Sequence, residues 1–144
     1  MHFNIKQEFS TVIKTTQELT SYSAVLGVVI ANNRKLQCIE QGEVAKKMGL
    51  SQSSYSRLES GKSSFSVDQM FQSVEALNLP FKDLFNQLCL TIELLRQNKI
   101  TVKGQLRRNS TEKRYQEQKN TNFDTYLTGE KLSTLISSLS EKIK

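Results

Sequence analysis

The chain has 144 residues, with 20 Lys and Arg against 14 Asp and Glu, so its net charge is +6. This length fits one main domain, and the basic balance makes nucleic acid or an anionic surface the first class of partner to consider. No apolar run approaches the ~18 residues that a membrane span needs, and we expect no secretory signal and no membrane partner. With one histidine, Cys38 and Cys89, the chain cannot supply a disulfide framework or a four-ligand zinc site, so we expect a cytoplasmic protein without metal or cofactor.

The positive charge is concentrated in one polar stretch, residues 96–119. It holds eight Lys and Arg against two Glu, a net +6, while the rest of the chain is balanced overall. Few large apolar residues and no sustained helical pattern are typical of a solvated linker. Two interpretations stay open: a merely soluble linker, or an arm that contacts DNA phosphates without sequence preference.

Apolar residues recur mostly every three to four positions, and proline occurs once, so we predict an all-α fold. The expected helices cover residues 4–19, 22–35, 41–48, 52–59, 67–77, 81–97 and 130–143. Candidate N-caps are Ser21 or Thr20, Ser51 and Ser66, and candidate terminating residues are Gly49 and Gly61. The brief alternation at 100–102 is compatible with a short strand but is not counted as one.

The helix expected from residue 81 carries a seam of apolar residues at alternating three- and four-residue steps, formed by Phe85, Leu88, Ile92 and Leu95. Other leucines lie off this seam, so the apolar surface is wide. Burial against the chain's own core and burial against a second subunit are both consistent with this pattern.

The most informative stretch is 40–62, which predicts a short helix, a tight turn at 48–51 and a second short helix. The exposed face of the second helix offers amide, hydroxyl and guanidinium groups. A helix fits the major groove of DNA, where Gln, Ser and Arg side chains can address base edges. Its N-terminal N–H groups also attract phosphate. The stretch therefore predicts a helix-turn-helix DNA reader.

This segment resembles the lambda-repressor/Cro-like (XRE) helix-turn-helix family. The matching pattern spans residues 22–85, from Leu26-Gly27 and Arg34, through Gln41, Val44-Ala45 and Met48-Gly49-Leu50-Ser51, to Tyr55, Arg57-Leu58-Glu59, Gly61-Lys62 and Leu77-Asn78-Leu79. The resemblance implies a five-helix domain that binds operators as a dimer.

The resemblance also implies base contacts from the second helix of the motif. Gln52 and Ser53, at its start, would touch bases, and Ser54 would touch bases or phosphate. Ser56 and Arg57, one turn further on, would reach bases or the backbone.

The remaining implied roles are phosphate contacts and structural support. Gln41 would contact a phosphate or orient the first residue of the recognition helix, and Ser60 and Lys62 would contact phosphates. Arg34 and Glu59 are expected to be a structural pair that ties the helix at 22–35 to the recognition helix.

Two features depart from the family pattern. Gly42 stands where a better helix former is usual, at a cost of about 1 kcal/mol relative to Ala. The link at 35–39 lacks the glycine that is common there.

On this basis the chain divides into an N-terminal extra helix (1–20), the helix-turn-helix domain (21–85), a helical extension that could serve dimerisation (86–98), a basic polar linker (99–128) and a C-terminal amphipathic helix (129–144). Residues 1–20 and 86–144 lie outside or beyond the family core, so the resemblance says nothing of their roles.

We predict a nucleoid-associated transcriptional regulator that binds double-stranded DNA as a homodimer on a palindromic operator, a repressor more readily than an activator. The sequence shows no Ser/His/Asp set, no phosphate-cradling Gly-rich loop and no persuasive carboxylate pair, so no catalytic residues are assigned. The alternative is an antitoxin-like or adaptor protein whose C-terminal tail binds a protein partner.

Overall fold

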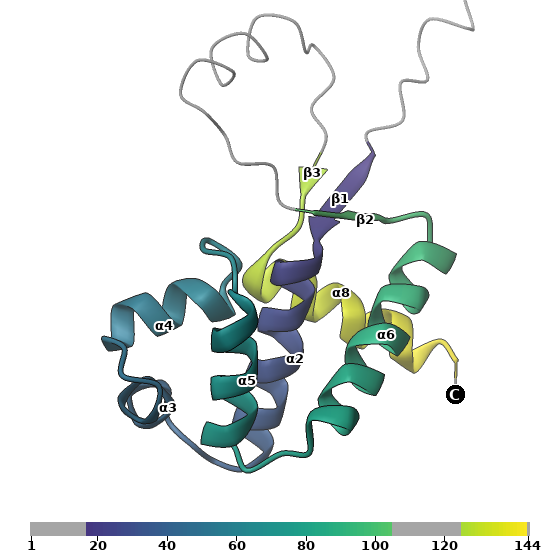
Figure 1. The fold of residues 1–144 in the computed structure, drawn as a ribbon. Helices are drawn as coiled ribbons and strands as arrows, with labels where there is room; N and C mark the ends of the chain where they lie inside the picture. The colour runs from purple at the N-terminus through teal and green to yellow at the C-terminus, as the bar shows by residue number, and fades with distance from the viewer. Residues whose placement is uncertain (1–16, 105–124, 144) are drawn as a thin grey trace, which may run out of the picture.

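The computed structural model describes residues 17–104 and 125–143. In that part of the chain the elements are β1 (Glu18–Ser21), α2 (Tyr22–Leu36), α3 (Gln41–Lys47), α4 (Gln52–Glu59), α5 (Val67–Ala76), α6 (Phe81–Gln97), β2 (Thr101–Lys103), β3 (Thr125–Tyr126) and α8 (Gly129–Glu141) (Figure 1). The protein is mostly helical, as predicted, and the helices from α2 onward lie where the sequence pattern placed them. No described helix is long and apolar enough to cross a membrane.

Three helices begin at serines whose side chains accept a hydrogen bond from the first turn. Ser21 accepts from the backbone N–H of residue 24 at 3.0 Å, Ser51 from residue 54 at 3.2 Å and Ser66 from residue 69 at 3.1 Å. Each bond satisfies a backbone donor that the helix itself leaves unpaired. The predicted caps are therefore confirmed.

Four helices end alike, with one residue in the left-handed conformation followed by an apolar residue packed on the core. The left-handed residues are Cys38, Gly49, Asn78 and Lys99. The apolar residues that follow them are Ile39, Leu50, Leu79 and Ile100. Each apolar residue donates its backbone N–H to the carbonyl five residues earlier, at 2.9–3.1 Å. This is the Schellman arrangement, which uses up carbonyls at the helix end and fixes the exit of the chain.

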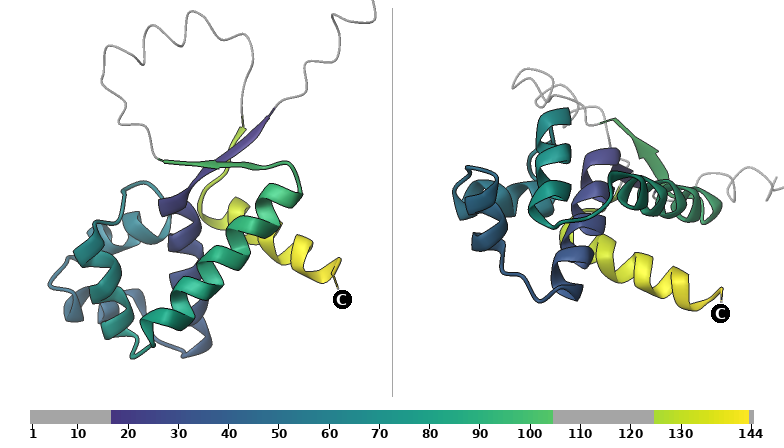
Figure 2. Two further views of the ribbon diagram at one scale, coloured as in Figure 1. Left: turned by 45° about the vertical axis from the view of Figure 1, so that its right-hand side comes forward. Right: turned by 60° about the horizontal axis from the view of Figure 1, so that its bottom comes forward.

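Helix α2 lies at the centre of the molecule. Its residues 24–30 are all buried, because α4 packs on one side while α6 and α8 cover others (Figure 2). A helix covered on several sides shows no polar stripe. Helix α4 therefore rests on the most buried helix of the described part of the chain.

A small parallel sheet joins segments that lie far apart in the chain. Strand β1 is central, with β2 on one side and β3 on the other. Buried Thr20 also donates its hydroxyl to the carbonyl of Leu127 at 2.8 Å. The expected helix at 4–19 is thus wrong at Glu18 and Leu19, whose backbone groups pair with neighbouring strands instead. Residues 1–16 lie outside the described part.

The sheet also brackets the expected polar linker. Strand β2 lies near its start and β3 near its end, and the residues between them, 105–124, are outside the described part. The brief alternation at 100–102 does correspond to a strand, shifted by one residue.

The predicted C-terminal helix is confirmed as α8, and it packs on α2 and α6 of its own chain. Its buried residues are Leu132, Ile136 and Leu139. The four apolar residues of the seam predicted on α6 differ in burial. Leu95 is fully buried, Leu88 and Ile92 are partly buried, and Phe85 is half exposed.

Candidate nucleic-acid interface

Helices α3 and α4 form a compact unit around a fixed turn. Met48 ends α3, Gly49 takes a φ of +69°, and the backbone N–H of Leu50 donates to the carbonyl of Ala45 at 2.9 Å. Ser51 then caps α4. Because Gly49 is in the left-handed region, where glycine carries no Cβ penalty, the turn is made without strain at this point.

Helix α4 has a buried side and an exposed polar side. Tyr55 and Leu58 are buried against the core. The exposed residues are Gln52, Ser53, Ser54 and Arg57, with Ser56 partly exposed beside them. The structure therefore places on one open surface all five residues for which base contacts were predicted.

Three serine hydroxyls are linked at the N-terminus of α4. The hydroxyl of Ser51 donates to that of Ser54 at 2.8 Å and lies 3.2 Å from that of Ser53. Ser51 also accepts the backbone N–H of Ser54. Ser53 and Ser54 are thus held next to the cap, at the end of the helix where backbone N–H groups favour an anion.

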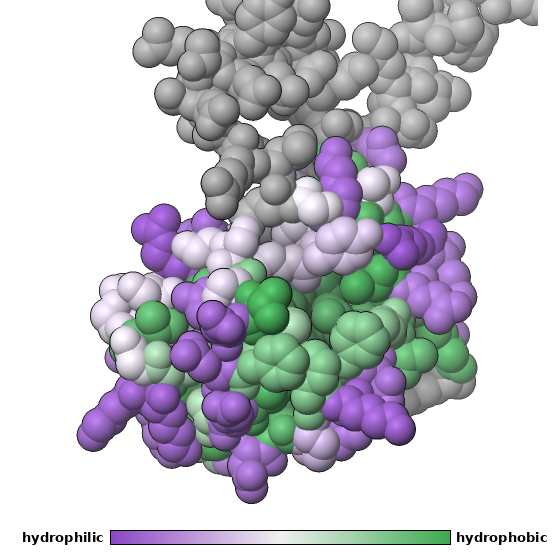
Figure 3. Space-filling model, viewed as in Figure 1, coloured by the Kyte–Doolittle hydropathy of each residue, from purple (hydrophilic) through white to green (hydrophobic). Residues whose placement is uncertain are grey.

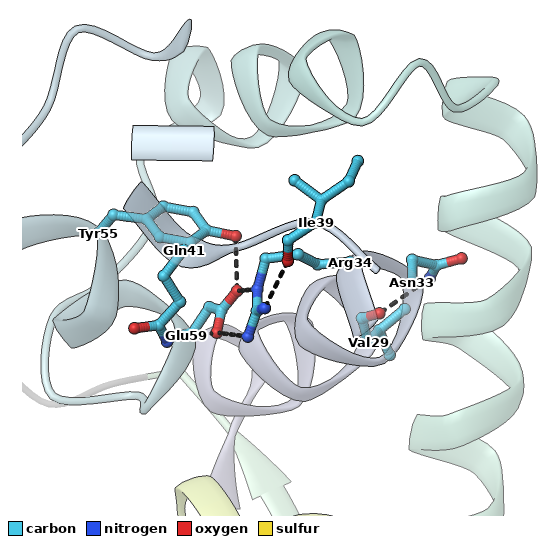
Figure 4. A network of polar contacts seen from close by, with 7 residues as sticks. All are labelled: Val29, Asn33, Arg34, Ile39, Gln41, Tyr55 and Glu59. Carbon is cyan, nitrogen blue, oxygen red and sulfur yellow. Dashed lines mark hydrogen bonds and ion pairs between the residues drawn. The ribbon is translucent and has the colours of Figure 1, made fainter. Parts of the chain in front are cut away.

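Behind α4 lies a buried polar network centred on the Glu59 carboxylate (Figure 4). Arg34 of α2 donates its Nε to Glu59 Oε1 at 2.6 Å and its Nη2 to Oε2 at 3.1 Å. Tyr55 donates its hydroxyl to Oε1 at 2.6 Å, and Gln41 of α3 donates its Nε2 to Oε2 at 2.8 Å. Arg34 also donates its Nη1 to the carbonyl of Ile39 at 2.8 Å. One carboxylate therefore connects α2, α3 and α4, and Arg34 also holds the backbone of the loop between α2 and α3.

The charges in this network stabilise one another. Burial alone would raise the pKa of Glu59, but the hydrogen bonds from Arg34, Tyr55 and Gln41 outweigh it and hold that pKa below its ordinary value. The hydrogen bond to Glu59 raises the pKa of Arg34. Burial, followed by the hydrogen bond to Glu59, raises the pKa of Tyr55. At neutral pH the network thus holds an ionised pair and a neutral phenol that acts as a donor.

Gln41 and Gly42 have roles that the sequence did not indicate. The amide nitrogen of Gln41 donates a hydrogen bond to Glu59, so this side chain stabilises the contact between α3 and α4. A Cβ on Gly42 would lie 3.2 Å from Oε1 of Gln52. The weak helix former at 42 thus leaves room for the Gln52 side chain against the start of α3.

The loop after α4 carries the two remaining predicted phosphate contacts. Ser60 is partly exposed and Lys62 is exposed. Ser60 donates its hydroxyl to the carbonyl of Arg57 at 3.3 Å. Further along this loop, the backbone N–H of Phe65 donates to the Ser23 hydroxyl of α2 at 2.8 Å, which ties the loop to the core.

Tyr55 and Gly27 are the positioning residues that the sequence analysis missed. The hydroxyl of Tyr55 reaches Glu59 four residues later, a spacing that places both on one side of a helix. A Cβ on Gly27 would lie 2.5 Å from the carbonyl oxygen of Glu59, so α2 and α4 approach more closely than any larger residue allows. A tyrosine and a glutamate four apart is the signal that could have indicated the first contact.

Metal-binding clusters do not occur in the described residues, where no group of three or more His, Cys, Asp and Glu side chains is placed to hold an ion. The features that the structure does bring together are a polar helix face, a capped N-terminus and a rigid support.

A short helix, a fixed turn and a second helix with an exposed polar face define a helix-turn-helix DNA-binding domain. Residues 30–84 match the model of the helix-turn-helix family HTH_3.

Among the similar solved structures, one has a TM-score above 0.5 and shows the same fold. The clp gene regulator ClgR from Corynebacterium glutamicum has a TM-score of 0.51 and 17% identity, over 69% of this chain and 94% of that one. A second ClgR structure has a TM-score of 0.47 and 20% identity, over 49% and 92% of the two chains. A mutant of the restriction-modification controller protein C.Esp1396I has a TM-score of 0.47 and 19% identity, over 52% and 95%. No curated protein sequence matches the chain.

Proposed function

We propose that this protein is a transcription regulator that binds a specific double-stranded DNA sequence by placing α4 in the major groove. The observation that carries the proposal is the exposed polar face of α4, supported from behind by the buried network around Glu59. Rigid placement matters because a base contact requires a side chain held in one register along the groove. Gene repression is the expected outcome, since a protein bound at a promoter blocks it without further contacts.

The proposed base contacts come from the first two turns of α4. Gln52 and Ser53 stand at the N-terminal end that enters the groove first, and Gln can pair bidentately with adenine. Ser56 and Arg57 lie one turn further on and reach bases or backbone. Ser54 contacts bases or a phosphate beside the capped helix end.

The proposed backbone contacts surround that helix. Ser60 and Lys62 follow α4 and face phosphates on one side of the groove. Gln41, whose amide nitrogen is held by Glu59, orients Gln52 from the start of α3 more readily than it reaches a phosphate itself.

We further propose that the protein works as a homodimer on a near-palindromic operator, in the cytoplasm at the nucleoid. A two-fold dimer would set its two α4 helices about 34 Å apart, one helical turn of DNA, or a multiple of this. The alternative of an adaptor that binds a partner through its tail gains no support from the described part of the tail, where the apolar side of α8 is already covered by α2 and α6.

The test of base recognition is Gln52→Ala. Affinity for the cognate site should fall by about 1–3 kcal/mol, with relaxed preference at one base position and unchanged binding to random DNA. Gln72→Ala, which removes an exposed amide on α5, is the matched control and should leave both affinities unchanged. An equal loss on every sequence would contradict base recognition by Gln52.

A second test concerns the basic stretch 96–119, of which residues 105–119 lie outside the described residues. Replacing Arg107 and Arg108 by Gln should reduce the salt dependence of binding by at most about two phosphate contacts if this stretch is a DNA-contacting arm. An unchanged slope would assign the stretch to solubility alone.

A further inference from the structure

We propose that the N-terminal segment of this chain, residues 4–14, forms an amphipathic helix that packs along an exposed apolar stripe on α6 of the same chain. The segment lies outside the described residues. The stripe runs along one side of α6 and onto the neighbouring α5, and it consists of Phe71, Phe81, Phe85, Cys89 and Ile92. Because the contact is made within one chain, it depends on neither the proposed homodimer nor the proposed DNA recognition.

The stripe begins with three stacked phenylalanines. The ring centroids of Phe71 and Phe81 are 4.4 Å apart, and those of Phe81 and Phe85 are 6.1 Å apart. Phe71 is nevertheless 42% exposed and Phe85 51% exposed. Apolar side chains gather over α5 and α6 on the face turned to the viewer in Figure 3. An exposed, contiguous apolar patch of this kind marks a surface that another segment or molecule covers.

The stripe continues along the same side of α6. Cys89 is one turn after Phe85, and it lines an open groove with Ile92, Arg96 and Tyr22. Arg96 donates to the Tyr22 hydroxyl at 2.8 Å at the far end of the groove. The apolar surface therefore runs from the start of α6 to the neighbourhood of Arg96.

The described core packs on other sides of this helix. Leu84 and Leu95 are buried there, and Gln87 accepts a hydrogen bond from Asn33 of α2 at 2.9 Å. Helix α8 packs against α6 as well. Phe85 stays half exposed despite these contacts, so no element within residues 17–104 and 125–143 covers the stripe.

The chain enters the described fold beside the far end of the stripe. Gln17 donates its side-chain amide to the hydroxyl of Thr101 in β2. It also lines a second hollow together with Arg96 and Ile100. Since Arg96 borders this hollow and the groove beside Ile92, the two are neighbours. The N-terminal segment is therefore attached where the stripe ends.

The segment before Gln17 has the length that the stripe requires. Gln17 and Arg96 line the same hollow, and Phe9 precedes Gln17 by eight positions. Eight positions before Arg96 on α6 is Leu88, next to Cys89. Helices rise by about 1.5 Å per residue, so each of these steps is about 12 Å. A segment that runs parallel to α6 therefore brings Phe9 beside Cys89.

The segment also carries an apolar side that can fill the groove. The spacing of Ile5, Phe9, Val12 and Ile13 places them on one side of a helix, whereas Phe3 falls off that side. An isolated helix of this length is marginal in water, so its apolar side requires a surface to pack on. The α6 stripe provides an apolar surface within reach of the segment.

The short connection favours the chain's own segment over that of a second copy. Residues 15 and 16 alone separate the proposed helix from Gln17. A segment tethered by so few residues is present at an effective concentration of about millimolar, provided that the connection can span the distance. Two extended residues span about 7 Å, and the hollow that contains Gln17 already adjoins the groove.

A disulfide between the segment and the stripe tests this placement directly. In the full-length protein carrying Cys38→Ser, Phe9→Cys followed by mild oxidation with diamide should form a disulfide to Cys89 within one chain. Peptide mass spectrometry identifies the link, and a non-reducing gel shows whether it joins one chain or two. Phe3→Cys is the matched control and should not form this link, because position 3 lies off the apolar side. A disulfide that joins two chains, or none at all with Phe9→Cys, would overturn the proposal.

The reactivity of Cys89 provides a second test without an engineered cysteine. In the full-length protein, Phe9→Ser should raise the rate at which N-ethylmaleimide modifies Cys89 by about tenfold or more, as expected when a central aromatic contact is lost. Phe3→Ser is the control and should leave this rate unchanged. Cys38, which is exposed at the end of α2, is the internal reference and should react equally fast in all three proteins.

Two results of the labelling experiment would contradict the proposal. An unchanged Cys89 rate in Phe9→Ser would show that the segment does not cover the stripe. A wild-type Cys89 rate that falls as the protein concentration rises would show that a second copy covers the stripe instead.

Discussion

The helix-turn-helix and the sheet–α8 side of the molecule are held together by different interactions. In the helix-turn-helix, one buried carboxylate, Glu59, receives hydrogen bonds from Arg34, Gln41 and Tyr55. On the other side, β1 pairs with two distant strands, and α8 adds the apolar residues Leu132 and Ile136 to the core.

The difference shows how each side contributes to the proposed function. A polar network with specific geometry fixes the orientation of α4 relative to α2 and α3, as a base-reading helix requires. Apolar packing and strand pairing on the other side close the core around α2 but demand no particular orientation from α4. We therefore expect changes in the first region to affect DNA recognition and stability together, and changes in the second to act through stability.

Glu59→Ala should have the largest effect. It leaves the buried Arg34 without its partner, and breaking a buried pair from one side costs about 3–5 kcal/mol. Urea denaturation at pH 7 measures this loss. Glu75→Ala, at an exposed position on α5, is the control and should change stability little.

Wild type and Glu59→Ala together also test the ionisation of Glu59. The pKa of Glu59 is lower in the folded state than its ordinary value of 4.5. The stability that ionised Glu59 contributes is therefore fully present above pH 4.5, and it is lost as the pH falls through the folded-state pKa. The stability difference between wild type and Glu59→Ala should therefore shrink as the pH drops below about 4.5. A difference that stays constant down to acid unfolding would mean that Glu59 is not the stabilising anion.

Leu132→Ala should cost about 2–5 kcal/mol, because a fully buried leucine is removed from the contact of α8 with the core. Thermal unfolding should remain a single transition, since α8 and the helix-turn-helix share α2. Ile143→Ala, at a 71% exposed position, is the control. If Leu132→Ala left the free energy of unfolding unchanged, α8 would be dispensable for the fold.

Tyr55→Phe should cost about 1–3 kcal/mol, because the ring still packs but the carboxylate loses a buried donor. Affinity for the cognate DNA should fall more than affinity for random DNA if the network positions α4. A loss of stability with an unchanged ratio of the two affinities would limit Tyr55 to a purely structural role.

Cys38→Gly should have the smallest effect and should stabilise the protein by up to about 1 kcal/mol. Cys38 has a φ of +57°, where a Cβ is strained and glycine is not. Cys38→Ala is the matched control: it also removes the thiol but keeps the strain, so it should give no gain. Equal stabilisation by both variants would assign the effect to the thiol.

Much of the first region could be predicted from the sequence because its signals are local. Ser51 and Gly49 mark a helix start and a turn within a few residues, and the spacing of Tyr55 and Leu58 marks a buried side. The exposed face of α4 followed directly from these positions.

The rest could not be predicted because its causes are long-range or lack a typical residue. Leu19 and Thr101 pair across the whole domain, and no local pattern at 17–21 favours a strand over a helix. Cys38, Asn78 and Lys99 adopt a conformation that usually indicates glycine. Tyr55 was predicted only as a buried residue, although its spacing of four residues from Glu59 was a signal for their hydrogen bond.

The central claim is that the polar face of α4 reads DNA sequence. Selecting bound sites from a pool of random duplexes with the full-length protein tests this most directly. We predict enrichment of one near-palindromic sequence whose half-sites are about 10 base pairs apart, or a multiple of this, with at least one enriched position lost in Gln52→Ala. A bound pool that is indistinguishable from the starting pool would contradict the claim.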